Sequence, residues 1–529
     1  MIKKLKQWVK DNKRICYSVV LVCFLIINGL FMYGTAGSGS KSILAVAGLC
    51  AFFLCILCAF DTIFRNRNNY IPRIFLVVLL SLGTMYSILF QPGTAPDETY
   101  HFQCSYKYSD YLLLKKPTAD SMAIRIVDVD MLEQMSGNNR LSYSRFTAIA
   151  DDFELHASSS EELSIQPQSA FSLGSNPPQL KISSAIGITI ARLLGLGCYP
   201  LFYLGRLFNF LPFAFLVYFA VKLTPVCRNA FMAIALLPMT LHISSSYSYD
   251  AGIIGLSLFL IAFCLKAIYS SEKLSLMHRI AIAVTALLLA PCKVIYALLI
   301  LMVFLIPQKV FASKSAAVFY KIGVPLFSLG MLLLLRLSSM LNLAGIGSTT
   351  GANQTVGGSG QVQFHSIYEF FSDPINTGRI FLDTLNAKGD FYFTSTIGGS
   401  LGWFQPELVS PWFIVMAFAI LLLLAFLKTP DSGPIAPFVH KLVYTGIFCL
   451  GFFATMLSMF FGHTAQQGTI IEGVQGRYLL PFLPMLALVI QNSIIESKKS
   501  LRLIILFGML TLNLAYLTRL YAISTMIVQ

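Results

Sequence analysis

The chain has 529 residues, of which 56% are hydrophobic and only 12% charged, and its mean hydropathy is +0.71. This balance excludes a soluble globular domain. The formal net charge of +14 does not indicate nucleic-acid binding, because most of the basic residues lie in short connections between apolar runs. The composition therefore predicts an all-α polytopic protein of the lipid bilayer.

Apolar runs of membrane-spanning length recur along the whole chain, each able to cross a hydrocarbon core about 30 Å thick. The first run follows a basic segment and is followed by no suitable cleavage site, so it is predicted to be a retained span and not a signal peptide. About thirteen transmembrane helices are expected, at 15–33, 42–62, 72–90, 202–221, 230–246, 251–270, 279–291, 294–307, 322–340, 411–427, 441–461, 479–496 and 503–521.

Basic residues predict the orientation of these spans, because Lys and Arg are enriched in cytoplasmic connections. With a cytoplasmic N-terminus, the basic clusters fall on alternate connections, and the C-terminus lies outside. Two large loops, about 91–201 and 341–410, are then extracytoplasmic. The expected organisation is a basic N-terminus with three spans at 1–90, the first outer loop at 91–201, a central transmembrane module at 202–340, the second outer loop at 341–410 and a C-terminal transmembrane module at 411–529.

Two apolar segments allow more than one topology. Residues 180–198 are apolar enough to span, but counting them would reverse the charge alternation, so a helix in the membrane interface is preferred. The run at 280–306 is interrupted by Pro291-Cys292-Lys293. Two short helices with Lys293 at their outer junction avoid a lysine at mid-bilayer, which costs about 2.5–3.5 kcal/mol.

The segment Pro96-Asp97-Glu98-Thr99-Tyr100-His101-Phe102 stands where the span at 72–90 gives way to the first outer loop. Ionisable groups at a membrane boundary are costly unless they are used. Two adjacent carboxylates can accept a proton from an attacking hydroxyl or hold a divalent cation. A solvated helix end would look the same, so the motif alone leaves both interpretations open.

Other polar residues are predicted on the same membrane face as this motif. Each one alone fits a boundary residue that reaches towards water, but together they gather on one side. Lysine and arginine can bind phosphate, arginine through two parallel hydrogen bonds. Gly476, beside Arg477, would let a ligand approach closely. The pattern therefore indicates an anionic, lipid-linked substrate, and the residues concerned are Asp250, Lys293, Gln475, Arg477 and Tyr478.

The Pro96-Asp97-Glu98-x-x-His101-Phe102 motif resembles the signature of a family of bacterial multi-pass membrane proteins of formerly unknown function, grouped with the GT-C superfamily of glycosyltransferases. The resemblance covers roughly 95–500. It is carried further by Asn176-Pro177-Pro178, Gly205-Arg206-Leu207, Ser248-Tyr249-Asp250-Ala251, Pro291-Cys292-Lys293, Gly402-Trp403 and Gln475-Gly476-Arg477-Tyr478-Leu479-Leu480-Pro481. Three expected spans before the acidic motif depart from the usual layout, in which one is commoner.

The resemblance implies an inverting glycosyltransferase of the bacterial plasma membrane with an extracytoplasmic active site. Its donor would be a polyprenyl-phosphate-linked sugar and its acceptor a cell-surface polysaccharide or the lipid-linked precursor. Asp97 is the first choice for the catalytic base, although Glu98 beside it leaves the choice open, and His101 would orient the acceptor. The substrate-binding residues would be Asp250, Lys293, Trp403, Gln475, Arg477 and Tyr478. Metal dependence stays open, with Asp97 and Asp250 as candidate ligands for Mg²⁺ or Mn²⁺.

Two other functions compete with this one. A transporter or flippase of lipid-linked saccharides also needs many spans and buried charges, but it would show inverted repeats or helices broken at mid-membrane, and the sequence shows neither clearly. A polysaccharide polymerase or ligase would share the location and the lipid donor and differ mainly in the size of the acceptor.

Overall fold

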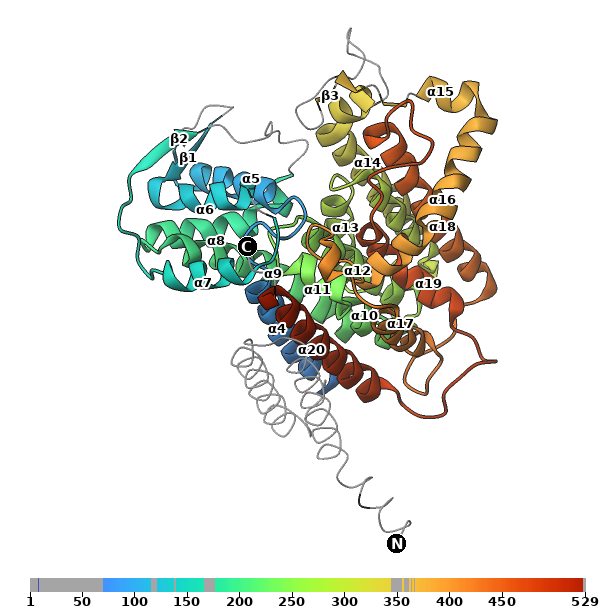
Figure 1. Cartoon of the computed structure of the whole chain (residues 1–529). Coiled ribbons are helices and arrows are strands. Elements are labelled where there is room, and N and C mark those ends of the chain that lie inside the picture. The colour runs from blue at the N-terminus through green and yellow to red at the C-terminus, as the bar shows by residue number, and fades with distance from the viewer. Residues whose placement is uncertain are drawn as a thin grey trace.

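The structure is a computed structural model, and it describes Trp8 and residues 70–115, 121–137, 139–165, 177–343, 354–355, 361–362, 364–365 and 367–526. The expected spans at 15–33 and 42–62 and most of the segment at 344–363 lie outside the described residues. Figure 1 shows a helical assembly in which a small lobe stands beside a larger body of long helices.

Six helices of the described part are long and apolar enough to cross a membrane, which confirms the prediction of a helical membrane protein. Such helices pair their backbone groups internally, as a hydrocarbon environment requires. The expected number of thirteen and the sidedness of the chain stay predictions. The six are α4 (Tyr70–Leu89), α9 (Cys198–Leu223), α12 (Asp250–Ile268), α14 (Lys314–Leu343), α18 (Phe438–His463) and α20 (Arg502–Met526).

Several other apolar runs form shorter or broken helices. The run expected as one span at 230–246 is two helices, α10 (Arg228–Ala235) and α11 (Pro238–Ser244). Pro238 causes this break, because a proline lacks the N–H of a helix interior and disfavours helical backbone at the residue before it. The run at 479–496 likewise divides into the 3₁₀ helix η6 (Gly476–Phe482) and α19 (Leu483–Ile490), with Pro481 and Pro484 in the chain.

The expected interruption at Pro291-Cys292-Lys293 is present. Helix α13 (Leu276–Leu289) ends before it, and the 3₁₀ helix η3 (Val294–Leu305) begins after Lys293. Arg336 of α14 stabilises the break by donating hydrogen bonds to the carbonyl oxygens of Pro291 and Cys292. Lys293 therefore lies at a helix junction, as the sequence predicted.

The smaller lobe in Figure 1, here called the cap, is built from the elements between Glu98 and Leu193. Its helix α8 packs against α5 and α9, and at 12 residues it is about 18 Å long, too short to cross a bilayer. Phe102, Tyr106 and Tyr247 belong to a buried cluster that joins the cap to the long helices. The elements of the cap are α5 (Glu98–Leu112), β1 (Met122–Arg125), α6 (Ile126–Gly137), α7 (Tyr143–Asp151), β2 (Glu162–Ile165) and α8 (Ile182–Leu193), with β1 and β2 antiparallel and Met122 opposite Ile165.

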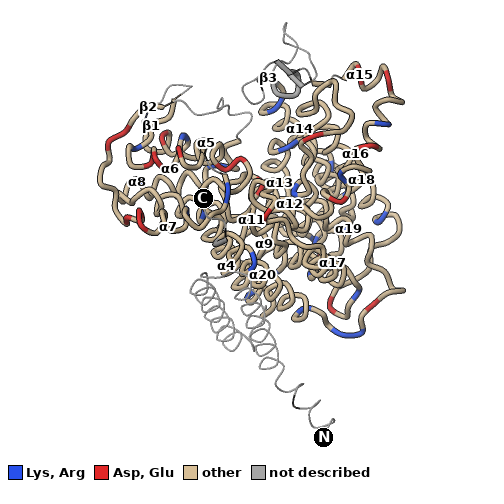
Figure 2. The backbone as a smooth tube through the Cα atoms, viewed as in Figure 1, with Lys and Arg blue, Asp and Glu red and all other residues tan. Residues whose placement is uncertain are grey.

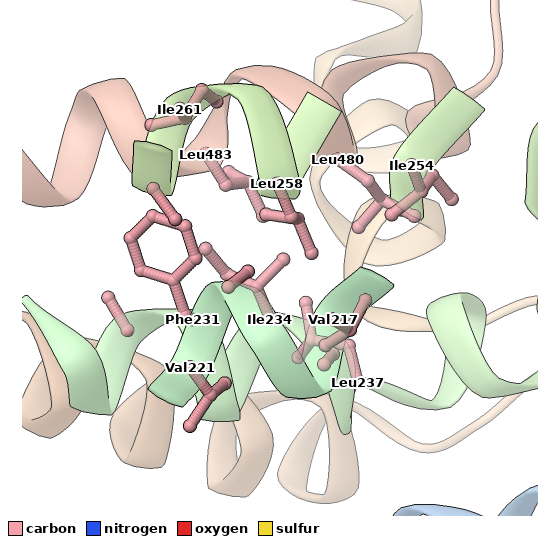
Figure 3. Close-up of a cluster of buried hydrophobic side chains, with 14 of the residues drawn as sticks. Val217, Val221, Phe231, Ile234, Leu237, Ile254, Leu258, Ile261, Leu480 and Leu483 are labelled. Carbon is pink, nitrogen blue, oxygen red and sulfur yellow. The ribbon is translucent and has the colours of Figure 1, made fainter. Parts of the chain in front are cut away.

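The core of the larger body lies between α9, α10, α12 and α19. Figure 3 shows apolar side chains from these helices meeting, among them Val217, Phe231 and Leu258. Helices α4 and α20 lie side by side (Figure 1), and the Tyr86 hydroxyl donates to Asn513 Oδ1 at 2.8 Å across them. Charged residues are sparse along the helices and more frequent in the cap and the loops (Figure 2).

The remaining elements connect the helices of the larger body or lie against them. Helix α16 is 24 residues long and contacts η6, α11 and α17. The remaining elements are η2 (Pro178–Leu180), η4 (Gln308–Val310), β3 (Gln354–Thr355), β4 (Gln361–Val362), α15 (Ile367–Ser372), α16 (Pro374–Ile397), η5 (Pro406–Leu408) and α17 (Trp412–Phe426).

Candidate functional site

The acidic motif forms the turn that starts helix α5. Asp97 precedes the helix with φ of 58°, in the left-handed region that non-glycine residues seldom adopt, although Asp tolerates it better than most. Its carboxylate is half-exposed, with 50% of the side chain accessible, whereas the next residue, Glu98, is fully buried. The two adjacent carboxylates therefore have opposite environments.

Glu98 is saturated by hydrogen bonds. Arg206 of α9 donates to both of its carboxylate oxygens, from Nε at 2.8 Å and from Nη2 at 2.6 Å. The backbone N–H groups of Gly93 and Tyr247 donate to it as well, at 3.0 and 3.1 Å. Arg206 in turn donates to the carbonyl oxygens of Ser87, Phe90 and Gln91. These contacts favour Glu98 as a structural anchor over the alternative of a catalytic base.

Asp250 and Lys293 meet on the other side of the turn. Asp250 begins α12, and its Oδ1 accepts a hydrogen bond from Lys293 Nζ at 2.8 Å. The Lys293 ammonium also lies 4.8 Å from the ring centroid of Tyr249 and 4.2 Å from that of Tyr478. An ammonium over aromatic faces is stabilised by the ring quadrupoles. The chain thus brings together helix ends that are more than 40 residues apart in sequence.

Arg477, in η6, joins both carboxylates. Its Nη2 donates to Asp97 Oδ2 at 3.3 Å, and its Nε lies 3.3 Å from Asp250 Oδ2. Only 5% of the Arg477 side chain is exposed, and within the described part of the chain its Nη1 has no hydrogen-bond partner. We call Asp97, Asp250, Lys293 and Arg477 the Arg477 cluster.

His101 and Lys181 lie next to the Arg477 cluster, on its cap side. The His101 ring meets Tyr249 edge-on at 4.7 Å, and its Nδ1 is buried with no partner among the described residues. Burial, together with the charges of Lys181, Arg477 and Lys293, lowers the pKa of His101 well below its usual range. The imidazole is therefore neutral and suited to bind a hydroxyl group.

Lys181, Tyr249 and Arg206 were not predicted as site residues. Lys181 is fully buried, donates to the Tyr247 carbonyl oxygen at 3.1 Å and lies 5.6 Å from the Tyr249 ring. Burial lowers the pKa of Lys181 to about 7. Lys181 and Arg206 each interrupt an apolar stretch, so isolated cations in such stretches were the signal that could have found them.

Two predicted substrate-binding residues, Gln475 and Trp403, make no side-chain hydrogen bond or ion pair with Asp97 or Arg477 among the described residues. Trp403 is 41% exposed in the turn after Gly402. Gly476 lies against α16. A Cβ there would lie 2.2 Å from the Thr396 backbone nitrogen, so this glycine is explained by close packing on α16.

The donor set does not fit a divalent cation at Asp97 and Asp250. Both carboxylates already face the Arg477 guanidinium, and the described residues contain no group of three or more His, Cys, Asp or Glu side chains that could hold a metal. A hard cation such as Mg²⁺ prefers several oxygen ligands without a competing positive charge.

Comparison with known proteins places the chain in a family. No curated protein and no solved structure matched it. Residues 80–486, from the middle of α4 to the middle of α19, match a family described as "Predicted membrane protein (DUF2142)". This range includes the acidic motif and every member of the Arg477 cluster. Because the match covers more than half of the chain, the protein belongs to the DUF2142 family of membrane proteins.

Proposed function

We propose that this protein is a membrane glycosyltransferase of GT-C type. It transfers a sugar from a polyprenyl-phosphate donor to a cell-surface polysaccharide or its lipid-linked precursor, on the extracytoplasmic face of a bacterial plasma membrane. The observation that carries the proposal is the half-exposed Asp97 carboxylate beside the buried Arg477 guanidinium, whose Nη1 has no partner within the described residues.

The arrangement supplies the two groups that such a transfer needs. A lipid-linked sugar phosphate carries its negative charge where the bond to the sugar breaks, and charge that develops there is stabilised best by fixed cations. Arg477 and Lys293 are cations held in place by ion pairs and aromatic rings. Asp97 is the carboxylate of the cluster that solvent, and hence an acceptor hydroxyl, can reach.

The proposed reaction is a single displacement. Asp97 takes the proton of the acceptor hydroxyl, and the hydroxyl oxygen attacks the anomeric carbon of the donor sugar. The bond from that carbon to the phosphate oxygen breaks, and its electron pair leaves with the polyprenyl phosphate, whose new charge Arg477 and Lys293 stabilise. The configuration at the anomeric carbon inverts. The neutral His101 orients the acceptor through a hydrogen bond.

Glycan composition tests this proposal most directly. A deletion strain is complemented with the wild type or with Asp97→Asn, and the surface glycan is analysed in each. Loss of one sugar substituent, restored by the wild type but not by Asp97→Asn at equal protein level, is the expected result. An unchanged glycan with accumulated lipid-linked precursor would overturn it in favour of a transporter.

A further inference from the structure

The charges of the Arg477 cluster alternate along a chain of contacts. Lys293 pairs with Asp250 at 2.8 Å, Asp250 lies 3.3 Å from Arg477, and Arg477 lies 3.3 Å from Asp97. Two cations and two carboxylates are balanced, so an arriving anion would meet no net positive charge from these four groups. An anion can bind tightly here only if Asp97 or Asp250 moves out of contact with its cation.

Exposure identifies which carboxylate can move. The Asp250 side chain is 7% exposed and is held by both Lys293 and Arg477, whereas the Asp97 side chain is 50% exposed and contacts Arg477 alone among these cations. Moving Asp97 costs little, because half-exposed ion pairs contribute only a small stabilisation. Moving Asp250 would leave Lys293, whose side chain is only 19% exposed, without its partner, which is costly.

Arg477 also has an unused hydrogen-bond donor that a new ligand could occupy. A guanidinium presents its donors as a fork that matches two oxygens of a phosphate. Within the described structure, Nη1 donates to nothing although the side chain is only 5% exposed. A phosphate bound at Nη1 and Nη2 would satisfy Nη1 and take the position on Nη2 that Asp97 now holds.

We infer that Asp97 occupies the phosphate position on Arg477 until a lipid phosphate displaces it. This inference rests on the proposed function, since it takes the donor phosphate as the anion. The displaced carboxylate is no longer paired with Arg477, so its oxygens are free to accept a hydrogen bond from the acceptor hydroxyl. The base is thus activated only when the donor is bound, so donor binding precedes deprotonation of the acceptor.

The test is the effect of Asp97→Asn on the binding of farnesyl phosphate to the purified full-length protein in detergent. Removing the competing carboxylate should tighten binding about fivefold, the equivalent of one weak ion pair. Asp152→Asn, which removes an exposed carboxylate of the cap, is the matched control for net charge and should bind as the wild type does. Arg477→Lys should weaken binding in the presence or absence of Asp97→Asn.

Equal or weaker binding by Asp97→Asn, with an unchanged melting temperature, would overturn the inference. Equal binding would mean that Asp97 does not compete with the phosphate, and weaker binding would mean that Asp97 contacts the phosphate directly. Tighter binding by Asp152→Asn to the same degree would also overturn it, because the gain would then follow from net charge alone. Transfer activity of the wild type is measured separately. It decides the proposed function and does not enter the comparison of binding constants.

Discussion

Two buried arginines lie close to the same acidic turn, and they differ in how completely their hydrogen bonds are used. Arg206 donates to both oxygens of Glu98 and to three backbone carbonyls, and neither partner is exposed. Arg477 holds two carboxylates at 3.3 Å and, in the described part of the chain, leaves Nη1 without a partner. A buried polar network that is fully satisfied rigidifies a fold, whereas an incomplete one marks a place where a ligand can complete it.

The same contrast separates Asp97 from Glu98, although they are neighbours in the chain. Both carboxylates face an arginine, but Glu98 is also held by the Gly93 N–H after α4 and by the Tyr247 N–H before α12, whereas Asp97 is half-exposed. Glu98 and Arg206 therefore position the turn, and Asp97 and Arg477 are left to interact with a substrate. The predictions below test this division of roles.

Breaking the Glu98–Arg206 pair should have the largest effect, and the effect should be on stability. Arg206→Met leaves the Glu98 carboxylate buried without its cation, so the free energy of unfolding should fall by about 3–5 kcal/mol. Thermal unfolding in detergent measures this loss. Asp97→Asn is the control and should unfold close to the wild type, because its carboxylate is half-exposed. Wild-type stability of Arg206→Met would show that Glu98 is not anchored by this pair.

Changing Arg477 should instead lower the rate of sugar transfer and leave the stability of the fold nearly unchanged. Arg477→Lys keeps the positive charge but loses the forked geometry, so transfer should fall about 100-fold, as for the loss of one donor to a developing charge. The melting temperature should change much less than in Arg206→Met. Rates of sugar transfer at equal amounts of folded protein provide the measurement. A variant that kept its transfer rate would place the leaving phosphate elsewhere.

The sequence predicted much of this site because its members are polar residues at the ends of apolar runs. Asp97, Asp250, Lys293 and Arg477 were all found in this way, and the structure brings them within hydrogen-bond or ion-pair distance of one another. The break at Lys293 was predictable for the same reason, since a lysine in mid-membrane is costly and a proline stands beside it.

The sequence could not assign different roles to Asp97 and Glu98. They are adjacent and chemically alike, and only the packing of α9, which brings Arg206 to Glu98, separates them. The break at Pro238 was missed because the run at 230–246 is mostly apolar, and hydropathy does not register one helix-breaking residue. The packing of Gly476 against α16 was not predictable either, because a glycine needed for helix packing looks the same in sequence as one needed for a ligand.

Lys181 lies between the Glu98–Arg206 pair and the Arg477 cluster, and its substitution should have the smallest of the expected effects. Its ammonium donates to the carbonyl of Tyr247, whose N–H donates to Glu98, and it lies beside the Tyr249 ring next to the Arg477 cluster. Burial lowers its pKa to about 7, whereas an unfolded lysine stays protonated to about pH 10.4. Between these pH values the unfolded chain binds more protons, so this residue makes the folded state more stable as the pH rises from about 7 to about 10.

Lys181→Met should remove that dependence. The wild type should gain stability relative to the variant as the pH is raised from 7 to 10, whatever constant cost the variant carries from the lost hydrogen bond to Tyr247. Melting temperatures across this pH range measure the change, and Lys499→Met, at an exposed position, is the control for loss of one positive charge. Parallel curves for the wild type and Lys181→Met would mean that Lys181 stays charged in the folded protein. Lys181 would then be a third fixed cation beside the Arg477 cluster, and the cluster with Lys181 would carry a net positive charge even with Asp97 in place.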